Sequence, residues 1–371
     1  MIDAKRLLGW FEPEDGAWMF HRGRLIATKG SASTVVVPPG PDLALRVADA
    51  ARGLLSNHRG PLVFAIPFDE RSQAIVSAPE EATVLANPKL PVVDTRGRAS
   101  LPLRYEPFPS PQRYEEMVSE ALKMIEVGDL DKIVLARMLI AHSSVPFDRK
   151  RLLEHLAVSE PDAAVFALNG FIGASPELLV SKHGNQLRAR PLAGTSRREE
   201  DPDGSRLLAG PKEAEEHRIV AQAVSGTLQE MCTSLTVDGP SLVATSTMWH
   251  LATEMTGTAA SGIDVMDLVT ALHPTPAVCG LPREAARKTI REIEGFDRMI
   301  YAGAVGWMDE SGDGEWFVAL RCAEVRGRMA MLFAGAGIVA GSDPSAELAE
   351  TSAKFLPMQR ALGSHQLPDE A

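Results

Sequence analysis

The segment from Met331 to Lys354 carries residues whose types and spacing suggest chemistry. Its pattern predicts a strand, a glycine-rich turn at residues 334–337, and a helix that is capped by Asp343. The two glycines of the turn allow bare backbone N–H groups to approach a ligand closely. We therefore predict a cradle for an anion at this turn, with an ordinary tight strand–helix connection as the alternative.

Two carboxylates and a lysine follow this turn on the predicted helix. Glu347 and Glu350 are three residues apart on one face, and Lys354 comes four residues after Glu350. An anion cradle beside two carboxylates suits a ligand that is anionic and also holds a metal ion. The alternative is a solvated charged face.

A second pair of glutamates with the same spacing lies on a predicted helix at residues 211–231. Glu213 and Glu216 share a face with apolar residues of this helix, which a merely solvated face would not require. If the two helices face each other, their carboxylates could surround one hard cation such as Mg²⁺, which takes one or two carboxylates directly and keeps several waters. Each pair alone is ordinary helix chemistry.

Lys132 and Glu177 are candidates for proton transfer. Lys132 heads a mostly apolar strand at residues 132–141, and Glu177 begins a strand at residues 177–181. A carboxyl group that points into a strand-rich interior has its pKa raised by desolvation. The alternatives are a solvated lysine at a strand end and a glutamate exposed at a strand entrance.

Three further positions offer polar groups. A predicted turn at residues 191–195 could donate hydrogen bonds through Gly194 and Thr195. Arg321 lies inside a predicted apolar strand, where a buried guanidinium needs an anionic partner. His250 follows a predicted strand, a place where a lone histidine is more often a satisfied core residue than a ligand.

The elements that must position these residues belong to a chain of 371 residues. We place a divergent N-terminal part at residues 1–100 and the functional part at residues 101–371, joined by a proline-dense stretch at 102–111. The formal net charge of −11 argues against a nonspecific nucleic-acid binder. The absence of a long apolar run predicts no membrane span, and three widely spaced cysteines with no apolar signal core predict a cytoplasmic protein.

These motifs, taken together and in order, resemble those of the chorismate-utilising enzymes. The resemblance runs over about residues 115–365 and rests on GDLDKIVLAR, GASPELLVS, RPLAGTSRR, KEAEEH, WHLATEMTG, HPTPAVCGLPREAA, LRCAEV and FAGAGIVAGSDPSAELAETSAK. It implies a single large α/β (α+β) fold in which extended antiparallel sheets are sandwiched by helices. The active site would lie between the sheets.

The resemblance also implies roles for the candidate residues. A magnesium ion would hold the ring carboxylate of chorismate, with Glu216 and Glu350 as direct ligands and Glu213 and Glu347 as second carboxylates. The enolpyruvyl carboxylate would be held by Arg321, Gly335, Gly337 and Lys354. Further substrate contacts would come from Gly194, Thr195, His250 and Ala277. Lys132 would be the general base that activates water for attack at C2, and Glu177 the general acid that protonates the departing 4-hydroxyl.

Two features indicate the branch of this family. Ala193 stands where the aminodeoxychorismate synthases carry an attacking lysine, and the HPTP at residues 273–276 is similar to that of isochorismate synthases. We therefore expect conversion of chorismate to isochorismate by a monomer that needs no glutaminase partner. Salicylate synthase, which goes on to eliminate pyruvate, is the first alternative. A non-catalytic chorismate- or nucleotide-binding protein is the second, and whether the product serves menaquinone or siderophore synthesis stays open.

Overall fold

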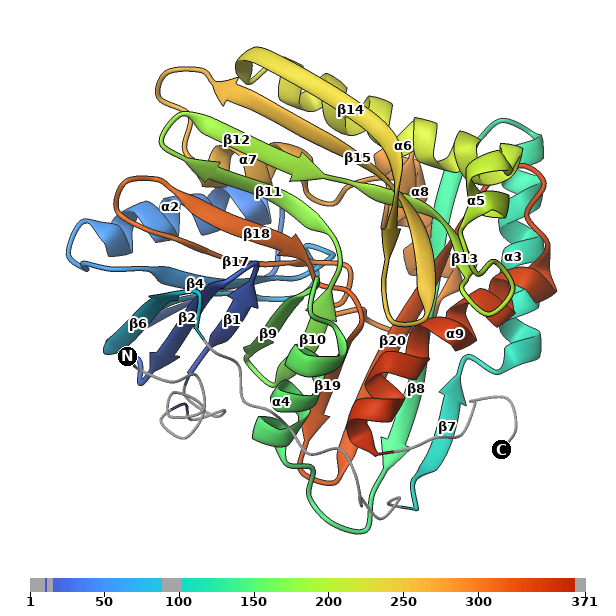
Figure 1. The fold of residues 1–371 in the computed structure, drawn as a ribbon, viewed down its shortest axis with the longest axis horizontal. Coiled ribbons are helices and arrows are strands. Elements are labelled where there is room, and N and C mark those ends of the chain that lie inside the picture. Colours follow the sequence, from blue (N-terminus) through green and yellow to red (C-terminus); the bar gives the residue numbers. More distant parts are fainter. Residues whose placement is uncertain (1–10, 12–15, 89–101, 364–371) are drawn as a thin grey trace.

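Two ten-stranded sheets dominate the computed structural model, which describes residues 11, 16–88 and 102–363 (Figure 1). All strand pairings recorded between neighbours are antiparallel. The first sheet runs in the spatial order β16 (Gly280–Leu281), β8 (Lys132–His142), β20 (Met329–Ile338), β19 (Cys322–Arg326), β10 (Phe171–Ser175), β9 (Ala164–Leu168), β1 (Trp18–His21), β2 (Arg24–Lys29) and β6 (Glu81–Ala86), with β7 (Arg104–Phe108) beside β8. The second runs in the order β13 (Leu192–Arg197), β15 (Met248–Ala259), β12 (Gln186–Arg190), β11 (Leu178–His183), β18 (Gly314–Val318), β17 (Ala304–Met308), β4 (Leu62–Ile66), β5 (Ala74–Ala78) and β3 (Ser33–Val37), with β14 (Cys232–Ala244) beside β15.

Helices pack against both sheets, which confirms the predicted α/β sandwich of helices and extended antiparallel sheets. The first sheet is covered by α3 (Pro111–Glu126), α4 (Arg149–Ser159), α8 (Arg283–Ile293) and α9 (Pro344–Leu362). The second is covered by α2 (Leu43–Leu55), α5 (Ser205–Ala209), α6 (Pro211–Gln229) and α7 (Val265–Leu272). Within the described ranges, no helix combines the length and apolarity that a bilayer span requires.

The first hundred residues contribute strands to both sheets. From this part of the chain β1, β2 and β6 join the first sheet, and β3, β4 and β5 join the second. The pairings of β1 with β9 and of β4 with β17 attach these strands to later parts of the chain. The boundary predicted between residues 100 and 101 lies outside the described residues.

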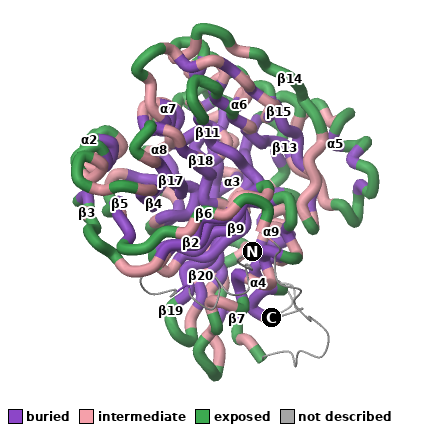
Figure 2. Tube along the Cα trace, turned by 60° about the vertical axis from the view of Figure 1, so that its left-hand side comes forward, coloured by how far each residue is buried: buried purple, intermediate pink, exposed green. Residues whose placement is uncertain are grey.

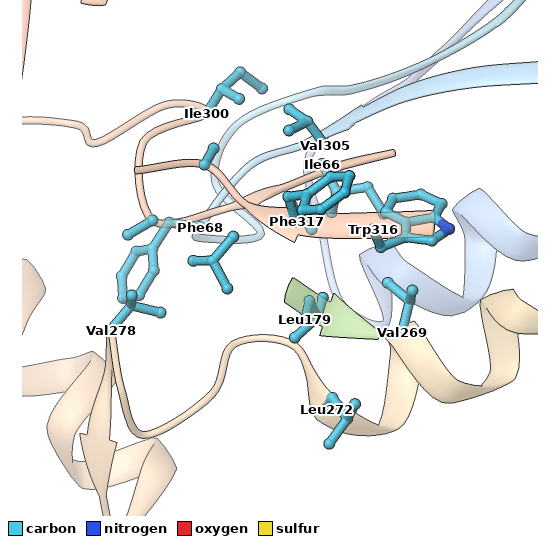
Figure 3. Packing of buried hydrophobic residues seen from close by; sticks show 14 of the residues in the cluster. Ile66, Phe68, Leu179, Val269, Leu272, Val278, Ile300, Val305, Trp316 and Phe317 are labelled. Carbon is cyan, nitrogen blue, oxygen red and sulfur yellow. The ribbon is translucent and has the colours of Figure 1, made fainter. Parts of the chain in front are cut away.

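Buried residues concentrate in the strands, while α2, α5 and β14 contain many of the exposed residues (Figure 2). The larger apolar cluster draws residues from both sheets, and a smaller one lies between the first sheet and the helices α4 and α9. Figure 3 shows part of the larger cluster, in which Trp316 and Phe317 of β18 lie near Leu179 of β11 and Val269 of α7. Each fully buried side chain of this size contributes roughly 1.5–3 kcal/mol to stability.

Helix α9 begins at the residues that the capping pattern predicts. Asp343 caps the helix by accepting a hydrogen bond from the Ala346 amide at 2.9 Å, and Pro344 occupies the first helical position. The helix ends at Gly363, whose φ of 93° is the left-handed conformation that favours glycine. Local sequence therefore sets both ends of the helix that carries Glu347, Glu350 and Lys354.

The predicted glycine-rich turn at residues 334–337 is wrong, because these residues lie inside β20. Gly335 pairs with Ala136 and Gly337 with Val134 of β8. The glycines serve close packing instead: a Cβ on Gly337 would lie 2.0 Å from the Glu216 carboxylate, and one on Gly335 would lie 2.9 Å from the Tyr301 hydroxyl. The turn comes later, at residues 340–341.

Arg321 was predicted inside a strand, and the structure places it instead in the connection between β18 and β19. Its φ of 47° is in the left-handed region, which an arginine rarely adopts. Backbone conformations of this kind are retained where the surrounding structure imposes them, often at functional sites. The side chain is only 9% exposed.

Candidate active site

One cavity is lined by residues of both sheets and by two helices. It encloses about 610 Å³ of space, part of which is open to solvent. Every predicted substrate-binding residue lines it, together with Glu177 and Glu216: Gly194, Thr195, His250, Ala277, Arg321, Gly335, Gly337 and Lys354. Lys132, Glu213, Glu347 and Glu350 lie outside this lining.

Glu177 is held at the cavity wall just before β11. Its backbone amide donates to Ser175 Oγ at 3.2 Å, and its carbonyl accepts from the Val318 amide at 3.2 Å. A register shift follows at once in β11, an irregularity of the kind that re-aims side chains near active sites. Burial raises the pKa of Glu177 to about 8, against the opposing effects of the Leu192 amide and Lys132. The carboxyl group is therefore protonated at neutral pH and can donate a proton into the cavity.

Lys132 lies at the start of β8 and is completely buried, so the solvated strand-end interpretation is wrong. Its Nζ lies 2.9 Å from Glu216 Oε1, and Glu216 in turn lines the cavity. The pair joins β8 of the first sheet to α6, which packs on the second.

Arg321, His250 and Thr195 form a hydrogen-bonded row along the cavity. The Arg321 guanidinium donates to His250 Nε2 at 3.1 Å, and His250 Nδ1 lies 3.3 Å from Thr195 Oγ1. Because arginine can only donate, Nε2 must be the unprotonated nitrogen of a neutral imidazole. Burial, reinforced by Arg321 and Lys354, holds the pKa of His250 well below its usual value.

No carboxylate among the described residues lies within salt-bridge distance of Arg321. The guanidinium is buried and faces the cavity, and burial lowers its pKa. An uncompensated buried cation costs several kcal/mol, which an anionic ligand would offset. This part of the cavity is therefore suited to a carboxylate, which arginine can bind through two parallel hydrogen bonds.

Lys354 connects α9 to the free edge of β20. Its Nζ donates to the Gly335 carbonyl at 2.8 Å and contacts Glu350 Oε1 at 2.5 Å. The pairing of β19 with β20 ends at Leu332, and none of the described strands pairs with that side of β20 beyond it. Since the N–H and C=O of a strand residue point to the same side, the Gly335 and Gly337 amides face this open edge.

The predicted turn at residues 191–195 is part of β13, with an irregularity at Gly194. The register against β15 shifts between Ala193 and Thr195, and Gly194 has a φ of 77°. A Cβ at Gly194 would lie 2.9 Å from the Glu213 carbonyl oxygen, so glycine lets α6 pack closely on this bulge. The bulge, rather than a turn, presents Gly194 and Thr195 to the cavity.

Three of the four predicted metal-binding carboxylates are paired with lysines. Glu216 contacts Lys132, Glu350 contacts Lys354, and Glu347 contacts Lys212 at 2.5 Å. Burial alone would raise the pKa of Glu216, but Lys132 and the two other lysines outweigh burial and lower it. Burial and the neighbouring Glu350 raise the pKa of Glu347.

The carboxylate oxygens of these glutamates are suitable ligands for a hard cation, but three of the four carboxylates are paired with lysine ammonium groups. Oxygen ligands from carboxylates are those that Mg²⁺ prefers. Among the residues that the structure describes, no three His, Cys, Asp or Glu side chains converge on one point that could hold a metal ion. A metal ion at this place would therefore have to compete with the lysine ammonium groups for the carboxylates.

Sequence reasoning missed several residues that line the cavity. Tyr301 and Phe333 stack with their ring centroids 5.3 Å apart, and both line it. Further apolar lining comes from Val134, Pro176, Leu192, Val278 and Leu320. Single apolar or aromatic residues carry no spacing signal, so only their place in the fold identifies them.

Comparisons with known proteins agree with the site. Residues 69–363 match the family model described as "Chorismate binding enzyme". The isochorismate synthase DhbC of Bacillus subtilis is 40% identical over 385 residues, covering 97% of this chain and 96% of that protein. The isochorismate synthase EntC of Escherichia coli K12 is 38% identical over 339 residues, covering 87% and 86%. A crystal structure from Bacillus anthracis, assigned as the 2,3-dihydroxybenzoate-specific isochorismate synthase DhbC, superposes with a TM-score of 0.88 at 37% identity and covers 97% of this chain and 99% of that one.

Proposed function

The chain belongs to the chorismate-binding enzymes, and on that premise we propose that it is an isochorismate synthase, an isomerase that converts chorismate to isochorismate. One observation carries the proposal: Glu177, a buried acid with a pKa of about 8, faces a cavity that also presents an Arg321 guanidinium without a carboxylate partner among the described residues. The chemistry needs both a proton donor and a place for a carboxylate. Chorismate has two carboxylates and a 4-hydroxyl leaving group.

The carboxylates of chorismate account for the cationic part of the cavity. Arg321 and Lys354 would bind the enolpyruvyl carboxylate, together with the amides of Gly335 and Gly337 at the open edge of β20. The neutral His250 orients Arg321 by accepting its hydrogen bond. A chain with a formal net charge of −11 thus offers a locally positive site.

The proton transfers balance over one turnover. As Lys132 takes a proton from the water whose oxygen forms the new bond at C2, both ring double bonds shift and the C4–O bond breaks. Glu177 supplies the proton that releases the 4-hydroxyl as water. Solvent then takes the proton from Lys132 and returns one to Glu177, which restores both groups. One water is consumed and one is released, so the product is an isomer of the substrate. Each such transfer typically contributes about 10²–10⁴-fold to the rate.

The pairing of Lys132 with Glu216 bears on the proposed base. Lys132 Nζ lies 2.9 Å from Glu216 Oε1, so the proposed base and a proposed magnesium ligand are in direct contact. The same contact fixes the Lys132 side chain at the end of the cavity that Glu216 lines.

We also propose that the carboxylates serve a magnesium ion. Glu216 and Glu350 would hold it, with Glu213 and Glu347 as supporting carboxylates, as the family resemblance implies. Bound magnesium would neutralise the ring carboxylate of chorismate and act as a Lewis acid there. The support from this chain is the oxygen donor set on α6 and α9.

The alternatives have less support. Salicylate synthase shares the first reaction, but the relatives named above are isochorismate synthases. Ala193 lines the cavity, where its small side chain leaves space for water as the nucleophile and offers no attacking amine. A non-catalytic binding protein would have no need for a buried acid with a raised pKa. No glutaminase partner is required, because water is the nucleophile.

Product identification tests the proposal. Purified protein is incubated with chorismate and magnesium, and the products are separated by chromatography and identified by mass spectrometry. We expect isochorismate to accumulate without an equal amount of pyruvate. Salicylate and pyruvate formed at equal rates would assign the chain to the salicylate synthases instead, and unchanged chorismate would refute an enzymatic role.

A further inference from the structure

Of the lysines in the three lysine–glutamate pairs described above, Lys212 is the one with no proposed role in binding or converting the substrate. Lys354 lines the cavity and Lys132 is the proposed base, whereas Lys212 lies outside the cavity lining. Its Nζ nevertheless contacts Glu347 Oε1 at 2.5 Å, and that glutamate is only 1% exposed. A glutamate is almost never buried this deeply unless it is paired, so the contact with Lys212 accounts for the burial of Glu347.

The position of Lys212 is electrostatically unfavourable within its own helix. It follows Pro211, the first residue of α6, so its charge lies in the first turn. The helix macrodipole places partial positive charge at that end, where cations are destabilising. The tertiary contact with Glu347 of α9 offsets this local cost, and it links two helices that both carry proposed magnesium ligands.

The three lysines differ in exposure, and exposure affects how readily another cation can replace a lysine ammonium group at its carboxylate. The Lys212 side chain is 26% exposed, whereas that of Lys354 is 14% exposed and that of Lys132 is 0% exposed. A partly exposed lysine on a flexible stem can move its ammonium group into water. A buried glutamate that loses its partner must acquire another positive group.

We propose that Lys212 is an internal counter-ion for Glu347. Its ammonium group pairs with the Glu347 carboxylate when no divalent cation is bound, and a cation must displace this ammonium group in order to bind there. This inference rests on the proposed function in one respect, which is that Glu347 belongs to the magnesium site. Lys212 acts through Glu347 and is a positioning residue. It weakens cation affinity, and it keeps a deeply buried carboxylate paired when no cation is bound.

Cation affinity in the absence of substrate tests this role. Mn²⁺, which accepts the same oxygen ligands as Mg²⁺, is titrated into the full-length protein, and free Mn²⁺ is counted by electron paramagnetic resonance. Mg²⁺ affinity follows from competition. Lys212→Met should lower the Kd for both ions by at least about tenfold, which corresponds to about 1.4 kcal/mol. Circular dichroism and thermal unfolding verify that the variant is folded.

Two further variants serve as controls. Lys212→Arg keeps the positive charge and should keep the parent affinity. Lys288→Met makes the same chemical change at a side chain that is 77% exposed on α8, and it should change nothing. A folded Lys212→Met protein with unchanged or weaker affinity would overturn the inference, as would tighter binding by Lys212→Arg.

The two proposals can fail separately. If the parent binds Mn²⁺ and Lys212→Met does not bind it more tightly, the counter-ion role is wrong while the magnesium site stands. If neither protein binds Mn²⁺, the counter-ion role is overturned, and the need for magnesium is decided by whether turnover survives chelation.

Discussion

Lys132 Nζ lies 2.9 Å from Glu216 Oε1, which joins the proposed general base directly to a proposed magnesium ligand. The two residues are 84 positions apart in the chain, on β8 and α6. Their contact means that the charge on the base and the charge on the ligand are not independent. Changes at either residue should therefore be interpreted as changes to the pair.

We predict that Lys132→Ala lowers kcat by about 10²-fold or more, because the attacking water loses the group that takes its proton. Chorismate binding should survive, since Arg321 and Lys354 hold the substrate. Steady-state kinetics measure both quantities, with Lys288→Met as the control. Lys132→Arg keeps the charge but cannot give up its proton; if it retained most of the activity, an electrostatic role would replace the general-base role.

The pH dependence of kcat/KM should show the titration of Glu177. The acid must be protonated to donate, and its pKa is raised to about 8 by burial, with Lys132 and Arg190 as the charged groups that oppose this effect. On the alkaline side, kcat/KM should therefore fall as the pH rises above about 8, because Glu177 loses its proton. Glu177→Gln should lower kcat by about 10²-fold or more and lose this alkaline fall. A parent profile that keeps rising beyond pH 9 would contradict the assignment.

The same residue should limit stability at high pH. The folded-state pKa of Glu177, about 8, exceeds its ordinary value of 4.5, so the stabilisation from its tighter proton binding is complete below pH 4.5 and is lost as the pH rises to about 8. Glutamine stays neutral and avoids that loss. We expect the free energy of unfolding of Glu177→Gln, relative to the parent, to increase between about pH 5 and about pH 9 in urea titrations.

A matched substitution separates this effect from a general one. Glu292→Gln changes a carboxyl group that is 59% exposed on α8, and it should give the same small difference from the parent at both pH values. If the stability of Glu177→Gln relative to the parent does not increase between about pH 5 and about pH 9, the carboxyl group is not desolvated in solution.

Magnesium removal is expected to stop turnover. EDTA should abolish isochorismate formation, and added magnesium should restore it. Glu350→Ala should lower kcat/KM by about 10²-fold or more, because several kcal/mol of charge stabilisation depend on the ion. Glu292→Ala, an exposed change of the same kind, should leave activity intact. Full turnover in metal-free buffer would refute the magnesium site.

The sequence by itself determined the parts of this protein that depend on local interactions. Asp343 and Pro344 begin α9 where the capping pattern predicts, because caps satisfy backbone groups within one turn. The strand at β8 and the helix at α6 follow from apolar spacing. The order of short motifs predicted a set of substrate contacts, and these residues line one cavity although they are far apart in the chain.

Only the tertiary structure decided what depends on burial and on distant partners. The residues at 334–337 look like a turn because glycine is locally permissive, yet pairing with β8 makes them a strand. The raised pKa of Glu177 comes from desolvation by burial. The pairs of Lys132 with Glu216 and of Lys212 with Glu347 join segments that no local pattern connects. Desolvation and ion pairing act through space, so their outcome is set when the sheets and helices pack together.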